Sequence, residues 1–290
     1  MNIVKPKSLK SGDKIAIVAP AGNIDKGNLF KGVKKLEEFG FDLIYSDSIF
    51  EKNRYLADTD ENKVKEIENY FEDSSISGIF CARGGYGSIR LVNKINHEIV
   101  KNNPKFFGGY SDITALQLMF LKKSGLVTYT SPMVCSDFGN DISQFTQQSF
   151  ENTVIKDEKP NLKGKIVASG EAEGILWGGN LSTVVSLCGM DFLPNEDFIF
   201  FAEDLNEPVY KIDKMFRQLI NIPQFKKYVK GIVFGEFSGI ENPNWLEELK
   251  NEIVSELKVP AIETLNITHS KDKLTLPVGE KFVIKDGNLM

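Results

Sequence analysis

The sequence predicts an α/β protein, in which an N-terminal domain with a doubly wound, mainly parallel sheet precedes a C-terminal α/β domain with a β-rich tail. Two observations lead to this fold class. Apolar, strand-like runs alternate with amphipathic helical patterns through the first half of the chain, which is typical of a parallel sheet covered by helices. The chain also has 290 residues, a length at which two domains are expected.

The first half contains the elements of the parallel sheet in order. Lys14–Pro20 is a continuous apolar run, as expected of a buried central strand. Parallel strands carry functional residues where they end, so the carboxyl ends of these strands are the expected place of the site. The later elements expected are a helix from about 29 to 39, a strand over 41–45, a helix over 62–71, a strand over 78–82, a helix over 88–95, a strand ending at 107, a helix over 112–122 and a strand over 126–130.

Near residues 157–172 the periodicity weakens into Lys, Pro, Gly and Glu residues, which indicates a connection between domains. We therefore predict an N-terminal domain over 1–158, a linker over 159–174 and a C-terminal domain over 175–290. The elements expected in the last are strands at 175–179, 197–202 and 231–235, helices from about 180, over 209–219 and over 245–257, and a hairpin over 273–283.

Composition and charge exclude several kinds of partner. Hydrophobic residues make up 41% and charged residues 26%, and the net charge of −5 includes no long run of one sign. We therefore expect neither nucleic acid nor a membrane as a partner. No apolar signal core precedes the first strand, and the three cysteines lack metal-ligand spacing, so a cytoplasmic protein with reduced thiols is expected.

The stretch from Phe106 to Thr114 contains the first candidate catalytic residue, Ser111. An apolar run ends in two glycines, Ser111 follows one residue later, and a helical pattern begins at once. Helix N-terminal amides would stabilise a serine alkoxide there, and a neighbouring amide could hold the oxyanion formed when it attacks a carbonyl. Serine is also a favoured N-cap of ordinary helices, so both interpretations stay open at this point.

Two other strand ends carry polar groups. The loop Arg83–Gly87 follows a strand, and its glycines allow the backbone to approach a ligand closely. It matches neither the dinucleotide pattern nor a P-loop, so no nucleotide cofactor is expected.

Glu203 and Asp204 end the strand that begins near 197. Such an acidic pair caps the next helix, faces solvent or orients a catalytic histidine.

The chain has only two histidines, so a His-rich metal site cannot be built and we expect no metal. His97 lies in a polar segment away from any strand end and receives no role. His269 follows a strand, as Ser111 and Glu203 do, and is the better candidate base. The chain order Ser, Glu, His also occurs in α/β-hydrolases, although their Gly-x-Ser-x-Gly elbow is absent here.

Several segments together resemble one family, the LD-carboxypeptidases (muramoyltetrapeptide carboxypeptidases), which include the microcin C immunity peptidases. The resemblance runs in family order over nearly the whole chain. The matching segments are Ser11–Pro20, Ala82–Gly87, Gly109–Thr114, Gly178–Ser182, Glu203–Asp204 with Glu207–Pro208, and His269 with Leu274–Gly279.

The resemblance implies a metal-independent serine peptidase without cofactors. On the matching positions, Ser111 would be the nucleophile, His269 the general base and Glu203 the carboxylate that orients it, while the backbone amides of Asp112 and Gly85 would form the oxyanion hole. The family places its active site between the two domains of what is usually a homodimer. Its implied substrate is a murein tetrapeptide that loses its terminal D-alanine during peptidoglycan recycling in the cytoplasm.

Two features bear on the substrate within this family. Gly179–Ser182 looks more like the murein enzymes than the immunity peptidases, which cleave aminoacyl or peptidyl adenylates and which we associate with a bulkier aromatic residue at this place. In contrast, many relatives carry His-Gly-Pro-Met where this chain has Thr130–Met133, so that Ser131 stands within a motif whose histidine is missing. The preferred diamino acid of the stem and a need for the glycan are left open.

Two other functions compete with this interpretation. Two α/β lobes around a ligand also resemble solute-binding proteins, which bind without catalysis. A cysteine hydrolase could use Cys81, which ends the strand before the glycine loop, although a buried structural thiol is the simpler explanation.

Overall fold

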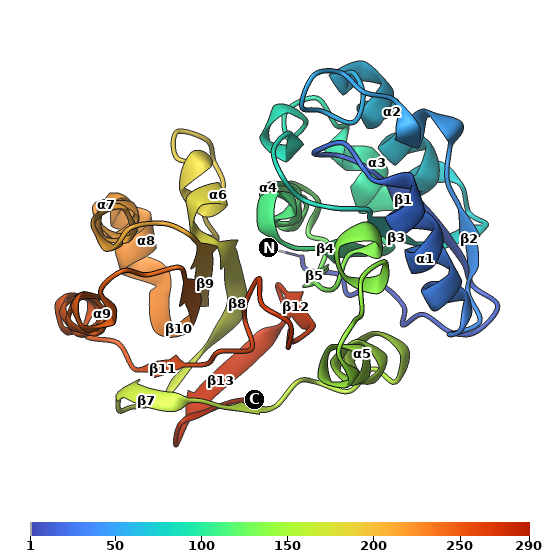
Figure 1. Ribbon diagram of the computed structural model, residues 1–290. Coiled ribbons are helices and arrows are strands. Elements are labelled where there is room, and N and C mark those ends of the chain that lie inside the picture. Colours follow the sequence, from blue (N-terminus) through green and yellow to red (C-terminus); the bar gives the residue numbers. More distant parts are fainter. Residues whose placement is uncertain (1) are drawn as a thin grey trace.

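The computed structural model describes residues 2–290 and has two lobes, each built around a β-sheet (Figure 1). Within these residues the first sheet has six strands in the order β12-β5-β4-β3-β1-β2, and the second has eight in the order β6-β14-β13-β8-β9-β10-β11-β7. The predicted fold class is confirmed, because the first sheet is mainly parallel and the second domain combines helices with a mixed sheet.

The first sheet is parallel except at β12, which pairs antiparallel with β5. Its strands are β1 (Lys14–Val18), β2 (Asp42–Ile44), β3 (Ile76–Cys81), β4 (Phe106–Gly109), β5 (Thr128–Thr130) and β12 (Leu276–Val278). The helices of this lobe are α1 (Lys26–Glu37), α2 (Asp60–Glu72), α3 (His97–Asn102), α4 (Thr114–Met119) and α5 (Gln144–Phe150). Short 3-10 or π-helical turns span Asp47–Phe50, Ser88–Arg90, Ser111–Ile113, Phe120–Ser124, Val134–Phe138 and Glu151–Ile155.

Both faces of the first sheet are buried, which explains the continuous apolar run of β1. Ile17 of β1 packs in one core with Leu36 of α1, whereas the next residue, Val18, packs in another with Phe71 of α2. Successive side chains of a strand point to opposite faces, so helices cover the sheet on both sides.

The second sheet is parallel at its centre, from β8 to β11, and antiparallel at its edges. The short strands β6 and β7 pair with this sheet and lie within residues 159–174, the segment predicted to connect the domains. Its strands are β6 (Leu162–Lys163), β7 (Lys165–Ala168), β8 (Ala172–Asn180), β9 (Phe198–Leu205), β10 (Val229–Ser238), β11 (Ala261–Glu263), β13 (Lys281–Lys285) and β14 (Asn288–Leu289), and its helices are α6 (Leu181–Ser186), α7 (Val209–Ile220), α8 (Pro223–Tyr228) and α9 (Pro243–Leu257).

Two local predictions were wrong. The expected hairpin over 273–283 does not form, because β12 joins the edge of the first sheet while β13 pairs with β8 in the second. An alternating apolar pattern does not say which strand it pairs with, and here the chain passes from one sheet to the other. The expected helix over 88–95 is only the 3-10 turn Ser88–Arg90, followed by further turns.

The two lobes share one hydrophobic core. Leu116 and Met119 of α4, which follows the strand carrying the candidate serine, belong to the same buried cluster as Trp177 of β8 and Leu181 of α6. In Figure 1 the strand β12 lies between the lobes, beside β5. Groups at the carboxyl ends of β4 and β9 are therefore held in a fixed relation by packing between the domains.

Candidate active site

Ser111 lies in a tight turn between β4 and α4. It is one of the few residues other than glycine with a positive φ, +63°, in the left-handed region that side chains with a β-carbon rarely adopt. The turn resembles the strained strand-to-helix bend on which α/β-hydrolases present a nucleophilic serine, although the glycine pattern of that motif is absent. Within residues 2–290 the hydroxyl group of Ser111 makes no hydrogen bond, so no contact inside the protein occupies it.

The glycine loop after β3 packs directly against Ser111. A β-carbon added at Gly84 would lie 3.0 Å from Cβ of Ser111, 3.2 Å from its Oγ and 3.6 Å from the amide nitrogen of Asp112. No larger residue fits at this close approach without a shift. The loop is held to the serine turn from its other end, because the carboxylate of Asp112 accepts a 2.8 Å hydrogen bond from the amide of Ser88.

The two predicted oxyanion donors, Gly85 and Asp112, directly follow Gly84 and Ser111, which lie close together. Gly85 has φ of +120°, which favours glycine, and its amide donates to no residue in the described part of the chain. The Asp112 amide lies next to Gly84 and therefore beside Ser111. The side chain of Asp112 is buried, and this burial raises its pKa, although hydrogen bonds from the Ser88 and Gly87 region oppose the rise.

The two residues of the acidic pair at the end of β9 make different contacts, and neither caps the next helix along the chain, α7. The side chain of Asp204 accepts hydrogen bonds from the amide of Ser182 (2.8 Å) and from Nδ2 of Asn180 (3.1 Å), so it holds the start of α6. Glu203 points elsewhere. Its carboxylate is buried, with 4% of the residue exposed, and Oε2 lies 2.6 Å from Nδ1 of His269.

His269 lies in the loop between β11 and β12 and is brought to Glu203 from 66 positions away in the sequence. Burial alone would lower the pKa of this imidazole. The hydrogen bond and negative charge of Glu203, together with the charge of Asp204, outweigh burial, so the pKa is raised above its ordinary value even though Lys273 opposes them. With Nδ1 held by a carboxylate, Nε2 is the nitrogen available to exchange a proton with another group.

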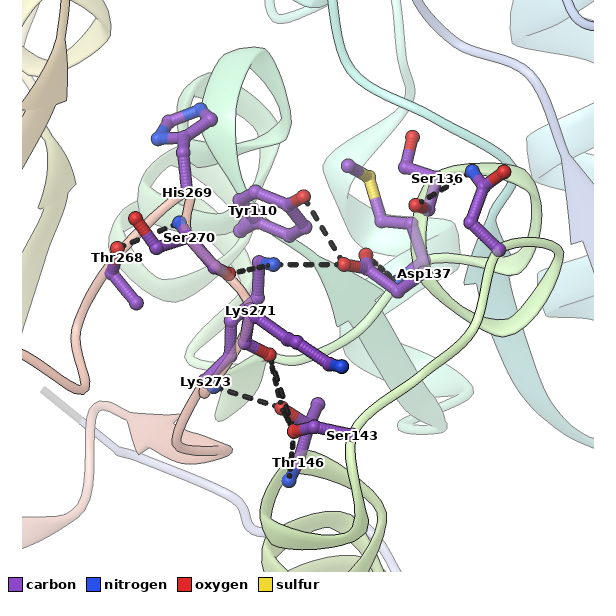
Figure 2. Close-up of polar contacts among 12 residues, drawn as sticks. Tyr110, Ser136, Asp137, Ser143, Thr146, Thr268, His269, Ser270, Lys271 and Lys273 are labelled. Atoms are coloured by element: carbon purple, nitrogen blue, oxygen red, sulfur yellow. Dashed lines mark hydrogen bonds and ion pairs between the residues drawn. The ribbon is translucent and has the colours of Figure 1, made fainter. Parts of the chain in front are cut away.

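Tyr110 and Lys273 connect the histidine to the first domain. The ring of Tyr110 packs edge-on against the ring of His269, with centroids 5.2 Å apart, and its hydroxyl group lies 3.4 Å from Oδ1 of Asp137. Lys273 forms a 2.9 Å ion pair with the same carboxylate, and both side chains are nearly buried. Figure 2 shows Tyr110 between His269 and Asp137, with Lys273 reaching the carboxylate from the histidine loop.

Both ends of the histidine loop are fixed. Glu236 of β10 accepts hydrogen bonds from the hydroxyl groups of Thr268 and Ser270, which flank the histidine. On the other side, Thr146 of α5 donates to the carbonyl group of Lys271 (2.8 Å) and accepts from the amide of Lys273 (2.8 Å). The loop is therefore held by the second domain on either side of the histidine and by the first domain at Lys271 and Lys273. Figure 2 shows the contacts of Thr146 with these two lysines.

A small pocket joins the two halves of the candidate site. It has a cavity volume of about 10 Å³, room for a single water molecule, and both Ser111 and Glu203 line it, with Asn180, Thr130 and Ser131. Ser131 is buried, and its hydroxyl oxygen has no hydrogen-bond partner among the residues that the structure describes. It therefore offers a polar group to the same pocket.

Neither His97 nor Cys81 has the contacts expected of a catalytic residue. The ring of His97 is bonded through Nε2 to the carbonyl group of Val92 at 2.8 Å. Cys81 is fully buried, and its burial and the charge of Asp112 raise the pKa of its thiol well above the ordinary value, which argues against a thiolate nucleophile. Residues 2–290 contain no group of three or more His, Cys, Asp and Glu side chains placed to hold a metal, and none of their helices is long and apolar enough to span a membrane.

Three residues of the site were not assigned from the sequence. Tyr110 could have been noticed, because it directly precedes the serine. Asp137 and Lys273 carry no comparable signal, since they lie far apart in the chain and neither belongs to a spaced motif; only the packing of the lobes brings them together.

Comparisons with known proteins agree with this architecture. Residues 15–131 match a family model described as the LD-carboxypeptidase N-terminal domain, and residues 173–284 match the LD-carboxypeptidase C-terminal domain. A probable murein peptide carboxypeptidase of Bacillus subtilis is 30% identical, covering 96% of this chain and 90% of that protein. The microcin C7 self-immunity protein MccF of Escherichia coli is 27% identical, covering 97% and 92%. The crystal structure of muramoyltetrapeptide carboxypeptidase from Oxalobacter formigenes superposes with a TM-score of 0.86 at 28% identity, covering 95% of this chain and 97% of that one.

Proposed function

The chain belongs to the LD-carboxypeptidase family, and on that premise we propose that it is a metal-independent serine carboxypeptidase that removes the terminal D-alanine of murein tetrapeptides. The observation that carries the proposal is the 2.6 Å contact between Nδ1 of His269 and Oε2 of Glu203, in a site whose pocket is lined by both Glu203 and Ser111. An imidazole held by a carboxylate, together with an unbonded serine that lines the same pocket as that carboxylate, supplies the groups needed to activate a hydroxyl nucleophile.

In this proposal Ser111 attacks the carbonyl carbon of the L,D peptide bond while His269 takes the hydroxyl proton at Nε2. The amides of Gly85 and Asp112 donate to the oxyanion that forms. The C–N bond then breaks, and the imidazolium gives its proton to the departing amine of D-alanine, which leaves the acyl group on Ser111. A water molecule, deprotonated by His269, hydrolyses this ester and restores the serine. Glu203 keeps the imidazole in the required tautomer and stabilises its charged form.

The name of the Bacillus subtilis relative supports murein peptides as the substrate class. The close approach at Gly179 agrees with that class, because a β-carbon added there would lie 2.6 Å from the side chain of Thr114 and no aromatic side chain fits. We extend the proposal to peptidoglycan recycling in the cytoplasm by a homodimer, as the family resemblance implies.

A second candidate function is the hydrolysis of aminoacyl or peptidyl adenylates, and the similarity to MccF favours it. It would use the same serine and histidine and would differ in the leaving group. Thr130 lines the pocket at the position where the resemblance leads us to expect the motif histidine, with Ser131 beside it, so this part of the site differs from that of many relatives.

Mass spectrometry with a panel of substrates tests the proposal. The purified protein is incubated with tetrapeptides that end in D-alanine or L-alanine, on both diaminopimelate and lysine stems, and with an aminoacyl adenylate analogue. We expect loss of one alanine from the D-terminated stems and none from the L-terminated ones. Cleavage of the adenylate alone would favour the second candidate, and cleavage of no substrate would refute both.

A further inference from the structure

A second pocket lies next to the glycine loop. It has a volume of about 580 Å³ and is lined by Gly22, Asn23, Tyr55, Arg83, Gly85 and Tyr86. Gly85 thus belongs both to this pocket and to the proposed oxyanion hole. The preceding residue, Gly84, contacts Ser111, so this pocket adjoins the turn that carries the proposed nucleophile.

Arg83 supplies a positive charge to this pocket that no carboxylate in residues 2–290 neutralises by an ion pair. Its Nε atom donates to the carbonyl group of Gly84 (3.2 Å) and Nη1 donates to the carbonyl group of Asn23 (3.0 Å), so two backbone contacts fix the guanidinium plane. Nη2 lies 3.9 Å from the position that a β-carbon would take at Gly85, and it has no partner in the described part of the chain. Arg83 is therefore a positioned cation with spare N–H donors, which is how proteins recognise carboxylates.

The rest of the pocket suits a small ligand with one apolar side. The rings of Tyr55 and Tyr86 pack edge-on, with centroids 5.7 Å apart, and about half of each side chain is exposed. The guanidinium carbon of Arg54 lies 5.3 Å from the Tyr55 ring and adds a second positive charge near the rim. Asn23 also offers a buried Oδ1 atom that lacks a partner among the described residues and can accept from a substrate N–H group.

We propose that this pocket binds the departing amino acid, and that Arg83 recognises its free α-carboxylate. The inference rests on the proposed function and explains why the enzyme would act only at a chain end. In a carboxypeptidase substrate, the carboxylate and the attacked carbonyl carbon are separated only by the nitrogen and α-carbon of the departing residue. The group that recognises the carboxylate must therefore adjoin the oxyanion hole, as Arg83 adjoins Gly85.

The other cation near the nucleophile is already engaged. Lys273 lines the pocket that contains Ser111, but its ammonium group is paired with Asp137 and donates to the carbonyl group of Ser270. Lys273 and Arg83 are the cations that line these two pockets, and within residues 2–290 only Arg83 keeps a nitrogen, Nη2, that has no hydrogen-bond partner. An internal peptide bond would place a neutral amide against it in place of a charged carboxylate, and the charged acceptor forms the stronger hydrogen bonds.

The test pairs a change in the enzyme with a change in the substrate. The rate of D-alanine release from the free-acid tetrapeptide is compared with the rate of D-alaninamide release from its C-terminal amide, for the wild type, Arg83→Gln and Arg83→Lys. We expect the wild type to prefer the free acid by roughly 10- to 100-fold, and the ratio of the two rates to fall close to one in Arg83→Gln. The readout is this ratio within each variant, because Arg83 also holds the glycine loop through its hydrogen bonds to Gly84 and Asn23. Arg83→Lys should restore part of the preference. Arg217→Gln, a change on α7 within a surface ion-pair cluster, is the matched control and should keep it in full.

Binding provides the same comparison without turnover. Calorimetric titration of Ser111→Ala and of Ser111→Ala/Arg83→Gln with the two peptides should show the free acid binding more tightly only when Arg83 is present. If Arg83→Gln keeps the preference in either experiment, the inference is wrong although the proposed function stands. If the wild type cleaves neither peptide, the proposed function fails and this inference fails with it.

Discussion

The side chains of Asp137 and Lys273 form a buried ion pair that joins the first domain to the loop carrying His269. The hydroxyl group of Tyr110 contacts the same carboxylate, and its ring packs against the imidazole. The polar cluster of Asp137, Lys273 and Tyr110 thus fixes the loop of the proposed base, His269, relative to the domain that carries the proposed nucleophile, Ser111.

Replacing the proposed nucleophile and base should give effects that are not additive. Ser111→Ala and His269→Ala are each expected to lower kcat by roughly 10⁴-fold or more, and the double variant should lose little beyond either single change, because each step needs both groups. Steady-state kinetics on a murein tetrapeptide measures this. Strictly multiplicative losses would contradict a shared mechanism.

The Glu203→Gln variant should be less impaired than either of those and should have an altered pH profile. The base acts in its neutral form, and its pKa is raised in the folded enzyme, so kcat/KM of the wild type should fall as the pH drops through a value above about 6.5. A glutamine removes the negative charge that raises this pKa while burial still lowers it. The acid limb should therefore move to lower pH; an unchanged limb would show that Glu203 does not face the titrating group.

Lys273→Met should shift the acid limb of the kcat/KM profile in the direction opposite to that expected for Glu203→Gln. The ammonium group of Lys273 opposes protonation of His269, whereas the carboxylates of Glu203 and Asp204 favour it. Across the domain interface, Asp137 pairs with Lys273 and the ring of Tyr110 packs against the imidazole. Removal of the ammonium group should shift the acid limb to higher pH and lower kcat. It should also destabilise the fold by up to about 3–5 kcal/mol, because the buried Asp137 loses its ion-pair partner and keeps only the hydrogen bonds from Tyr110 and the amide of Met133.

The control for that variant is Asp137→Asn/Lys273→Met, which removes both charges. Its thermal unfolding should recover most of the lost stability, whereas the shift in the pH profile should persist. A profile like that of the wild type in both variants would mean that Lys273 only joins the domains and does not influence the histidine.

Chelators are expected to leave the activity intact, because every proposed step uses Ser111, His269 and backbone amides. D-alanine release is measured before and after dialysis against EDTA. A loss of activity that zinc restores would contradict the metal-independent mechanism.

Much of the fold could be predicted from the sequence, because the central strands of the first sheet, β1, β3 and β4, are buried on both faces and helices alternate with them. Ile15 to Val18 is the clearest case. Strand partners at sheet edges could not be predicted in this way. The pattern over 276–285 is the same whether β12 and β13 form a hairpin or, as observed, join different sheets.

The site divides along a similar line. Ser111, Glu203 and His269 were identified by motifs that match a family, and the structure brings the last two into contact. The sequence does not show that Glu203 contacts His269 while Asp204 contacts the start of α6. Adjacent residues on a strand point to opposite faces, and only the folded structure shows which face lies toward the histidine. Arg83 belongs to the matching segment Ala82–Gly87, but the sequence does not show which of its N–H groups are left without hydrogen bonds in the folded loop.

Mass spectrometry can test whether the protein is a carboxypeptidase that uses Ser111 as its nucleophile. A D-alanine-terminated murein tetrapeptide is incubated with the wild type and with Ser111→Ala under identical conditions. We expect the wild type alone to remove one alanine, and the variant, folded as judged by circular dichroism, to leave the peptide intact. Release of D-alanine by Ser111→Ala at the wild-type rate would contradict the assignment of the nucleophile.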